Sequence, residues 1–182
     1  IISGNSKFDV GRTMGFNNFT DSERRGLQIF NAEAYENDPS NNGGDCFHCH
    51  GAPLFMTREY MNNGLDTVFS DQGFGAVTGD PNDDGKFKVP SLRNIEKTAP
   101  YMHDGRFETL EEVIDHYSEG VKDHPNLDFE LKKDGKPRNM NFSEGEKIAL
   151  EAYLRTLTDN SIAYEEKYVK RLFGNTTKMN VR

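Results

Sequence analysis

The run Cys46-Phe47-His48-Cys49-His50 determines how this chain of 182 residues is interpreted. It is a C-x-x-C-H motif, the pattern through which proteins attach a c-type haem covalently. Two thiols at this spacing reach the two vinyl groups of one porphyrin, and the histidine behind them coordinates the iron as proximal ligand. The sequence therefore predicts one covalent haem c held by Cys46, Cys49 and His50, with His48 as a variable residue of the motif.

Two other interpretations of the motif are weaker. A zinc site would need two more ligands at regular spacing, and the sequence has no second C-x-x-C and no H-x-x-x-H. A redox dithiol would stand at a strand-to-helix turn, without a histidine directly behind it. Both cysteines of the chain lie in the motif, so none is left for a disulfide elsewhere.

The composition excludes some classes of function and favours others. The chain has 22 Lys and Arg against 30 Asp and Glu, and a net charge of −8 argues against a nucleic-acid-binding surface. Hydrophobic residues make up 34% of a chain with 17 Gly, which indicates long loops and a small core. No apolar run approaches the length of a membrane span. Because haem is normally attached to C-x-x-C-H outside the cytoplasm, we expect a periplasmic or otherwise extracytoplasmic protein, exported before a leader or larger upstream segment was removed.

Capping boxes predict where the helices begin. A Ser or Thr is followed three residues later by Glu at Thr20/Glu23, Thr109/Glu112 and Ser143/Glu146. The predicted fold is mainly α, a cytochrome c-like helical haem domain with long loops. We assign residues 1–19 to an extended arm, 20–160 to the haem domain and 161–182 to a C-terminal helical extension.

Apolar spacing predicts the buried faces of the second and third of these helices. Leu110, Val113, Ile114 and Tyr117 form one stripe, which leaves His116 on the polar, solvated side. The inner face of the third helix is predicted to contain Ile148, Ala149, Ala152, Tyr153 and Leu157.

A haem iron held by His50 has one further position, and its occupant decides between electron transfer and peroxide chemistry. The candidates are Met102, Tyr117, His103, His116, His124 and Met140. Met102 lies far enough beyond the motif for a loop to bring its side chain back to the haem. His/Met ligation would then give a higher-potential carrier. Tyr117 could bind ferric iron as a phenolate. The alternative for each is ordinary core packing.

Several runs of the sequence resemble the di-haem cytochrome c peroxidase/MauG family. They are ISGNSKFD at 2–9, KFKVPSLRN at 86–94, TAPYMHDG at 98–105, TLEEV at 109–113 and YLRTLT at 153–158. The resemblance covers most of this chain but only the C-terminal haem domain of that family. It therefore implies a partner, a second haem domain that lies outside this sequence.

The resemblance also implies roles for individual residues. The position fourteen residues after the histidine of the H-D-G run carries a distal Met in the peroxidase branch and a Tyr in the MauG branch, and here it is Tyr117. This favours Tyr117 as the distal ligand, with Met102 lining the haem pocket. Thr98 and Pro100 would offer backbone carbonyls to a calcium ion between two domains. Arg93 would pair with a haem propionate, or else be a surface arginine.

Together these observations predict an oxidoreductase domain whose six-coordinate haem stores or relays electrons while peroxide reacts at the partner haem. The isolated chain would then be a poor peroxidase, and a redox protein would be its other partner. The first alternative is a free-standing monohaem electron-transfer cytochrome with His/Met ligation. The second is a haem-sensing module with an exchangeable sixth ligand.

Overall fold

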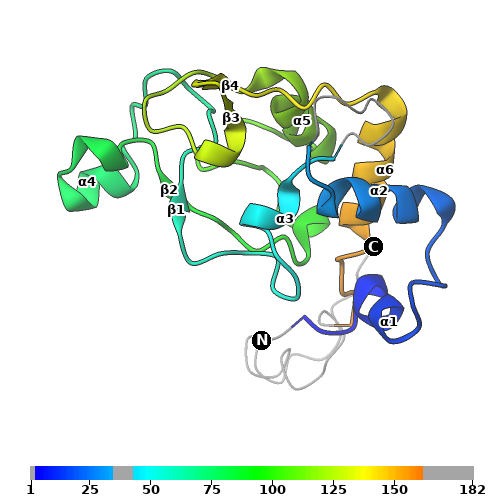
Figure 1. Ribbon diagram of the computed structural model, residues 1–182. Coiled ribbons are helices and arrows are strands. Elements are labelled where there is room, and N and C mark those ends of the chain that lie inside the picture. The colour runs from blue at the N-terminus through cyan, green and yellow to red at the C-terminus, as the bar shows by residue number, and fades with distance from the viewer. Residues whose placement is uncertain (1–2, 35–42, 162–182) are drawn as a thin grey trace, which may run out of the picture.

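The computed structural model describes residues 3–34 and 43–161 and consists mainly of helices joined by loops (Figure 1). The helices are α1 (Lys7–Thr13), α2 (Asp21–Asn31), α3 (Cys46–Cys49), α4 (Phe74–Thr78), α5 (Leu110–Asp115) and α6 (Glu144–Arg155). Within these ranges, four two-residue strands form two antiparallel pairs, β1 (Tyr60–Met61) with β2 (Phe87–Lys88) and β3 (Lys132–Lys133) with β4 (Lys136–Pro137). Single 3-10 turns are η1 (Pro81–Asp83), η2 (Ile95–Lys97) and η4 (Phe129–Leu131), and η3 (His116–Gly120) is a π-helical turn that continues α5. The prediction of a mainly α chain is confirmed.

The predicted helix starts agree with the structure. At Thr20, Thr109 and Ser143 the glutamate three residues later accepts the backbone N–H of the capping residue. Each box uses side chains to satisfy N–H groups that the first helical turn leaves without partners. These starts are determined locally, which is why the sequence alone is sufficient to find them.

The expectation of an extended arm over residues 1–19 is wrong for its central part, where the structure has α1. A fourth capping box begins this helix, with Ser6 as the cap and Asp9, rather than a glutamate, in the N3 position. Phe8 is 3% exposed and packs edge-on against Phe55, with ring centroids 4.9 Å apart. A helix of seven residues is unstable alone, so these tertiary contacts are needed to hold it. The predicted extension over 161–182 lies outside the described residues, except for Ser161.

The ion pair between Asp9 and Arg93 attaches α1 to the rest of the protein. The guanidinium of Arg93 donates two hydrogen bonds of 2.9 Å to the carboxylate of Asp9 and a third, of 2.7 Å, to the carbonyl of Ser3. Burial raises the pKa of Asp9, but the bonds from Arg93 and Ser6 and the charge of Arg93 more than offset this. The pKa of Asp9 therefore lies below its ordinary value.

We expect the variant Asp9→Asn to reduce the free energy of unfolding at pH 7 by about 2 kcal/mol, because it removes charge-assisted hydrogen bonds to a largely buried guanidinium. Since the folded pKa is below the unfolded value of 3.8, the contribution of Asp9 is complete above that pH and is lost as the pH falls through the folded pKa. Urea unfolding at pH 7 and at pH 3 measures the effect. A difference between variant and parent that is as large at pH 3 as at pH 7 would contradict this assignment.

Helices α2 and α6 pack against each other at the centre of the core (Figure 1). Gly26 allows this close approach, because a Cβ there would lie 1.9 Å from the carbonyl oxygen of Ala149 and 2.7 Å from the Cβ of Tyr153. The ring of Phe30, one helical turn further along α2, packs 5.1 Å from that of Tyr153. The buried crossing thus depends on a glycine that helix propensity alone would disfavour.

The predicted inner face of α6 is wrong at Ile148, which is 63% exposed. Leu150 and Leu154 are buried instead, together with Ala149 and Tyr153 as expected. The contact with Gly26 seats Ala149 and Tyr153 against α2, and this turns the helix so that Ile148 faces solvent. Leu157, past the end of α6, is fully buried as predicted.

Residues 51–100 form short elements joined by turns. In Figure 1, α4 and its flanking loop stand apart from α2 and α6. The Asp80–Gly85 run that leads away from α4 is an ordinary turn, in which Asp80 Oδ1 accepts the backbone N–H of Asn82 at 2.9 Å. No helix within the described ranges has both the length and the apolar character needed to cross a membrane.

Candidate cofactor site

The C-x-x-C-H motif folds into a single helical turn, α3. Asp45 precedes it in a left-handed conformation (φ 51°), and the N–H of His50 closes the turn on the carbonyl of Cys46 at 2.9 Å. Gly44 makes room for the first thiol, since a Cβ there would lie 3.0 Å from Cys46 Sγ. Both cysteines are free and half-buried. The turn therefore presents two thiols and one imidazole from a single short segment.

The imidazole of His50 is oriented by the backbone of the following loop. Its Nδ1 lies 3.1 Å from the carbonyl oxygen of Phe55. A carbonyl only accepts, so Nδ1 carries the hydrogen and Nε2 is left as the nitrogen with a lone pair. Burial lowers the pKa of His50, and hydrogen bonds to the carbonyls of Phe55 and Pro90 offset only part of that effect. A neutral imidazole held through Nδ1 is the form that offers Nε2 to a metal.

The two thiols are protonated at neutral pH. Burial is the main cause that raises the pKa of Cys46 to about 12, and the charges of Cys49 and Asp45 add to it. Burial likewise raises the pKa of Cys49 to about 12, with smaller effects from Asp128 and Glu130. Because the thiolate is the reactive form in disulfide exchange, this environment is unsuited to a redox dithiol.

Tyr117, on the π-helical turn η3, is placed near the motif. Burial raises the pKa of its phenol to about 12, the charges of Cys49 and Cys46 raise it further, and a hydrogen bond with the Asn63 side chain acts in the opposite direction. The side chain is half-buried. The structure thus brings Tyr117 close enough to both thiols for their charges to act on it.

Met102 and Tyr117 share one neighbour, Asn63. The amide Nδ2 of Asn63 lies 3.4 Å from Met102 Sδ, and the same side chain hydrogen-bonds with Tyr117. Met102 is half-buried and has a left-handed backbone (φ 72°). Sequence reasoning missed Asn63, because Asn-Asn-Gly indicates only a turn. No sequence signal distinguishes an amide that contacts a site from one that shapes a loop.

The expectation that His116 is solvated is wrong. It is 5% exposed, and its Nε2 donates to the backbone carbonyl of Asn63 at 2.9 Å. Burial is the main cause that lowers the pKa of its imidazole. The physical reason lies in η3, where the wider π-helical turn shifts the register and brings His116 inward beside Tyr117.

The remaining candidates are found in other surroundings. Arg93 donates to Asp9, Ser3 and Pro53, so its pairing with a propionate stays a prediction. His103 is exposed and stacks on Phe87 at 3.8 Å, and His124 contacts the side chain of Asn62 at 3.3 Å. Met140 is buried, with its backbone N–H bonded to the carbonyl of Tyr117. Thr98 and Pro100 are exposed, and a calcium ion there also stays a prediction.

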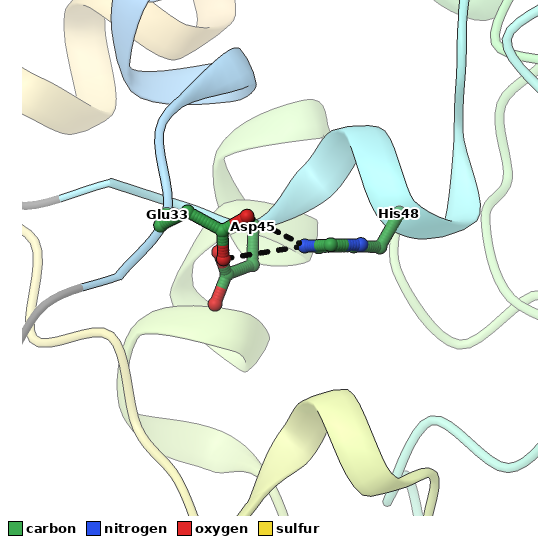
Figure 2. Close-up of side chains that lie close together, drawn as sticks. All are labelled: Glu33, Asp45 and His48. Atoms are coloured by element: carbon green, nitrogen blue, oxygen red, sulfur yellow. Dashed lines mark hydrogen bonds and ion pairs between the residues drawn. The ribbon is translucent and has the colours of Figure 1, made fainter.

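The side chain of His48 points toward Glu33 and Asp45 (Figure 2). Its Nε2 lies 3.3 Å from the Glu33 carboxylate, and its Nδ1 lies 3.4 Å from Glu130. The ligand atoms of Glu33, Asp45 and His48 lie within 4.8 Å of one another. Asp45, however, already accepts from the Ala34 N–H and pairs with Arg138. The group is therefore a polar network that holds Asp45 and His48 in place at the start and middle of the motif turn.

One buried atom near the motif has no partner in the described part of the chain. The hydroxyl of Tyr153 belongs to a fully buried residue and makes no hydrogen bond. Burial is the main cause that raises its pKa, and the charge of Cys46 adds to it. Because an unsatisfied buried hydroxyl is costly, a hydroxyl without a partner next to a motif thiol indicates that a further group binds there. The residues present thus fit a covalently bound haem.

Comparisons with known proteins agree on one family, although no protein-family model matches the chain. It is 32% identical over 160 residues to the methylamine utilization protein MauG of Methylorubrum extorquens, covering 86% of this chain and 40% of that protein. It is also 32% identical over 152 residues to the cytochrome-c peroxidase IdrP1 of a Pseudomonas species, covering 66% of this chain and 38% of that protein.

Solved structures give the same answer for the fold. A MauG-like protein associated with microbial copper homeostasis is 36% identical, with a TM-score of 0.70 over 91% of this chain and 51% of that one. The diheme peroxidase BthA from Burkholderia thailandensis is 22% identical and has a TM-score of 0.64, which shows a shared cytochrome-like fold. The chain spans about half or less of the length of these proteins. These similarities in sequence and structure show that the chain belongs to the di-haem cytochrome c peroxidase/MauG family.

Proposed function

We propose that this chain is a c-type haem oxidoreductase domain of the di-haem peroxidase/MauG type. The observation that carries the proposal is the single turn with Cys46, Cys49 and His50, in which the carbonyl of Phe55 occupies Nδ1 and leaves Nε2 for iron. The two thiols would hold the porphyrin, and His50 would be the proximal ligand. When bound, haem c supplies a redox-active iron.

Tyr117 is the residue we propose on the distal side. A phenol is neutral at pH 7 even at its ordinary pKa, and burial raises the pKa of Tyr117 further, so a phenolate there requires a nearby cation. Bound ferric iron is such a cation and would bind the deprotonated oxygen. With both axial positions filled by protein, the domain would store or relay an electron rather than bind peroxide itself.

The proposed partner is a second haem domain or chain at which peroxide reacts. This is supported by the share of the relatives that the chain spans, 40% of MauG and 38% of IdrP1. A separate redox protein would exchange electrons with the pair. We also propose a location outside the cytoplasm, where haem c is attached, and a calcium ion held by the carbonyls of Thr98 and Pro100 at a domain boundary.

The proposal is tested by the peroxide turnover of the isolated chain carrying its haem. Because its iron would have no open position, we expect turnover close to that of the buffer control, together with reversible one-electron oxidation and reduction. Stopped-flow spectroscopy with hydrogen peroxide and a reducing donor measures both properties. Rapid turnover by the isolated chain would disprove the assignment of a filled, electron-storing site.

We expect Tyr117→Phe to change the absorption spectrum of the oxidised haem and to raise its reduction potential, because removing an anionic ligand destabilises ferric iron. Spectroelectrochemistry of the purified holoprotein measures both quantities. Tyr60→Phe, at a tyrosine that is 42% exposed, is the matched control and should change neither. An unchanged spectrum in Tyr117→Phe would remove Tyr117 from the iron.

A free-standing electron carrier with His/Met ligation remains the second candidate. The observation in its favour is that Met102 is half-buried and contacts the same amide as Tyr117. Met102→Leu separates the two functions. A large rise or fall of the reduction potential in this variant, with none in Tyr117→Phe, would favour the carrier.

A further inference from the structure

Asn63 is placed between the two candidate distal ligands. Its side-chain nitrogen lies 3.4 Å from Met102 Sδ, and its side chain also hydrogen-bonds with Tyr117. A primary amide has two N–H donors on one nitrogen, so it can serve a sulfur and a phenol oxygen together. Because the amide nitrogen donates, Asn63 is placed to act on both candidate ligands.

The backbone around Asn63 is clamped to the segment that carries Tyr117. The carbonyl of Asn63 accepts from His116 Nε2 at 2.9 Å, and the carbonyl of Gly64 accepts from the N–H of Lys122 at 2.7 Å. The turn itself is closed by Asn62, whose side-chain oxygen accepts the N–H of Gly64 at 2.9 Å. These bonds fix the turn that carries the amide against η3 and the residues that follow it.

The packing leaves this turn little freedom to move. Asn62 is fully buried, and a Cβ on Gly64, whose φ is +67°, would lie 2.7 Å from Val121 Cγ1. Replacing Asn62 or Gly64 would therefore disturb the turn itself. Asn63 is half-buried, so its side chain can be changed with less effect on the surrounding backbone.

A hydrogen bond donated to a phenolate draws electron density away from the oxygen. The oxygen then donates less to the iron, and the oxidised state loses part of its stabilisation. The contact with Met102 Sδ has a different consequence, since it holds the thioether at the turn and so favours Tyr117 over Met102 as ligand. The first contact therefore raises the potential of the tyrosine-ligated haem, and the second determines which side chain is the ligand.

We propose that Asn63 is a positioning residue of the distal site, which orients Tyr117 toward the iron, keeps Met102 off it and raises the reduction potential of the tyrosine-ligated haem. This inference rests on the proposed function, because it requires haem on the motif and Tyr117 on the iron. It goes beyond that function by assigning the control of the distal ligand to a residue outside the ligand set.

The test compares Asn63→Leu and Asn63→Asp with the parent, as the full chain carrying its haem. Leu removes both donors without adding a charge, and Asp has the shape of Asn but accepts instead of donating. We expect the reduction potential to fall in the order parent, Asn63→Leu, Asn63→Asp. The fall for Leu should shift the one-electron equilibrium about tenfold, or about 59 mV. Because Asp keeps the shape of the side chain, it decides the question if Leu disturbs the turn.

Asn82→Leu, the same change at an exposed amide in the turn that follows α4, is the matched control and should leave the potential close to that of the parent. An effect equal to that of Asn63→Leu would overturn the proposal that Asn63 acts through its contacts at the distal site. Potentials unchanged in both Asn63 variants would overturn the proposal as a whole. A merely structural role would lower the melting temperature in both variants without producing the predicted order of potentials.

The failure of this inference can be distinguished from failure of the proposed function. If the intact mass shows no haem, or if Tyr117→Phe leaves the spectrum unchanged, the proposed function fails. If Tyr117→Phe shifts the spectrum and potential while the Asn63 variants do not, only the role of Asn63 fails.

Discussion

The double variant Cys46→Ser/Cys49→Ser is expected to contain no covalently bound haem. Serine hydroxyls do not form the thioether bonds, and both cysteines of the chain lie in the motif. Intact-mass measurement of the denatured protein, after production in a host that matures c-type cytochromes, should show the parent heavier by one haem and the double variant at the bare polypeptide mass. Each single variant should retain at most one thioether.

The matched control lies inside the same motif. His48→Ala changes a motif residue whose ring faces Glu33 and Glu130 rather than the thiols, so the mass of bound haem should be retained. A double serine variant that keeps covalent haem, or a parent that never acquires it, would contradict the interpretation on which the proposed function depends.

Gly26→Ala is expected to reduce the free energy of unfolding by about 3 kcal/mol, the upper part of the range for overpacked cores. The added Cβ would lie 1.9 Å from the carbonyl oxygen of Ala149, and a backbone atom cannot move aside as a flexible side chain can. Helices α2 and α6 would have to separate, which would also loosen the contact between Phe30 and Tyr153. Denaturant unfolding followed by circular dichroism measures the loss.

Gly145→Ala provides a control of identical chemistry. Gly145 lies in α6 with nothing within 4 Å of a Cβ, so alanine should be neutral or stabilise the helix by up to about 1 kcal/mol. Equal effects of the two substitutions would show that the crossing of α2 and α6 is not as close as described.

Whether a helix could be predicted from sequence depends on whether nearby or distant residues determine it. The starts at Thr20, Thr109 and Ser143 follow from capping residues within three positions of one another, so local patterns identify them. Helix α1 was missed although Ser6 and Asp9 form a local capping box, because a helix of seven residues is held only by the burial of Phe8 against Phe55 and by the ion pair of Asp9 with Arg93. A local pattern contains no information about such partners.

Some residues of the candidate site could likewise be predicted from a local motif, and others depend on distant segments. The motif itself identifies Cys46, Cys49 and His50 as haem-binding candidates, because thioether attachment and proximal ligation require a short local spacing. The proximity of Tyr117 to the thiols, the orientation of His50 by Phe55 and the amide of Asn63 depend on loops that return from elsewhere in the chain. The inward turn of His116 also depends on η3, whose π-helical register a 3.6-residue period does not describe.

The sequence by itself determined the cofactor chemistry that this protein is built for, and it determined where three of its helices begin. Both depend on residues within a few positions of one another. Only the tertiary structure decided which face of α6 is buried, how α1 is held and which side chain lies between Met102 and Tyr117. Those outcomes depend on close packing and hydrogen bonding between distant segments, and neither is encoded in any single stretch of the chain.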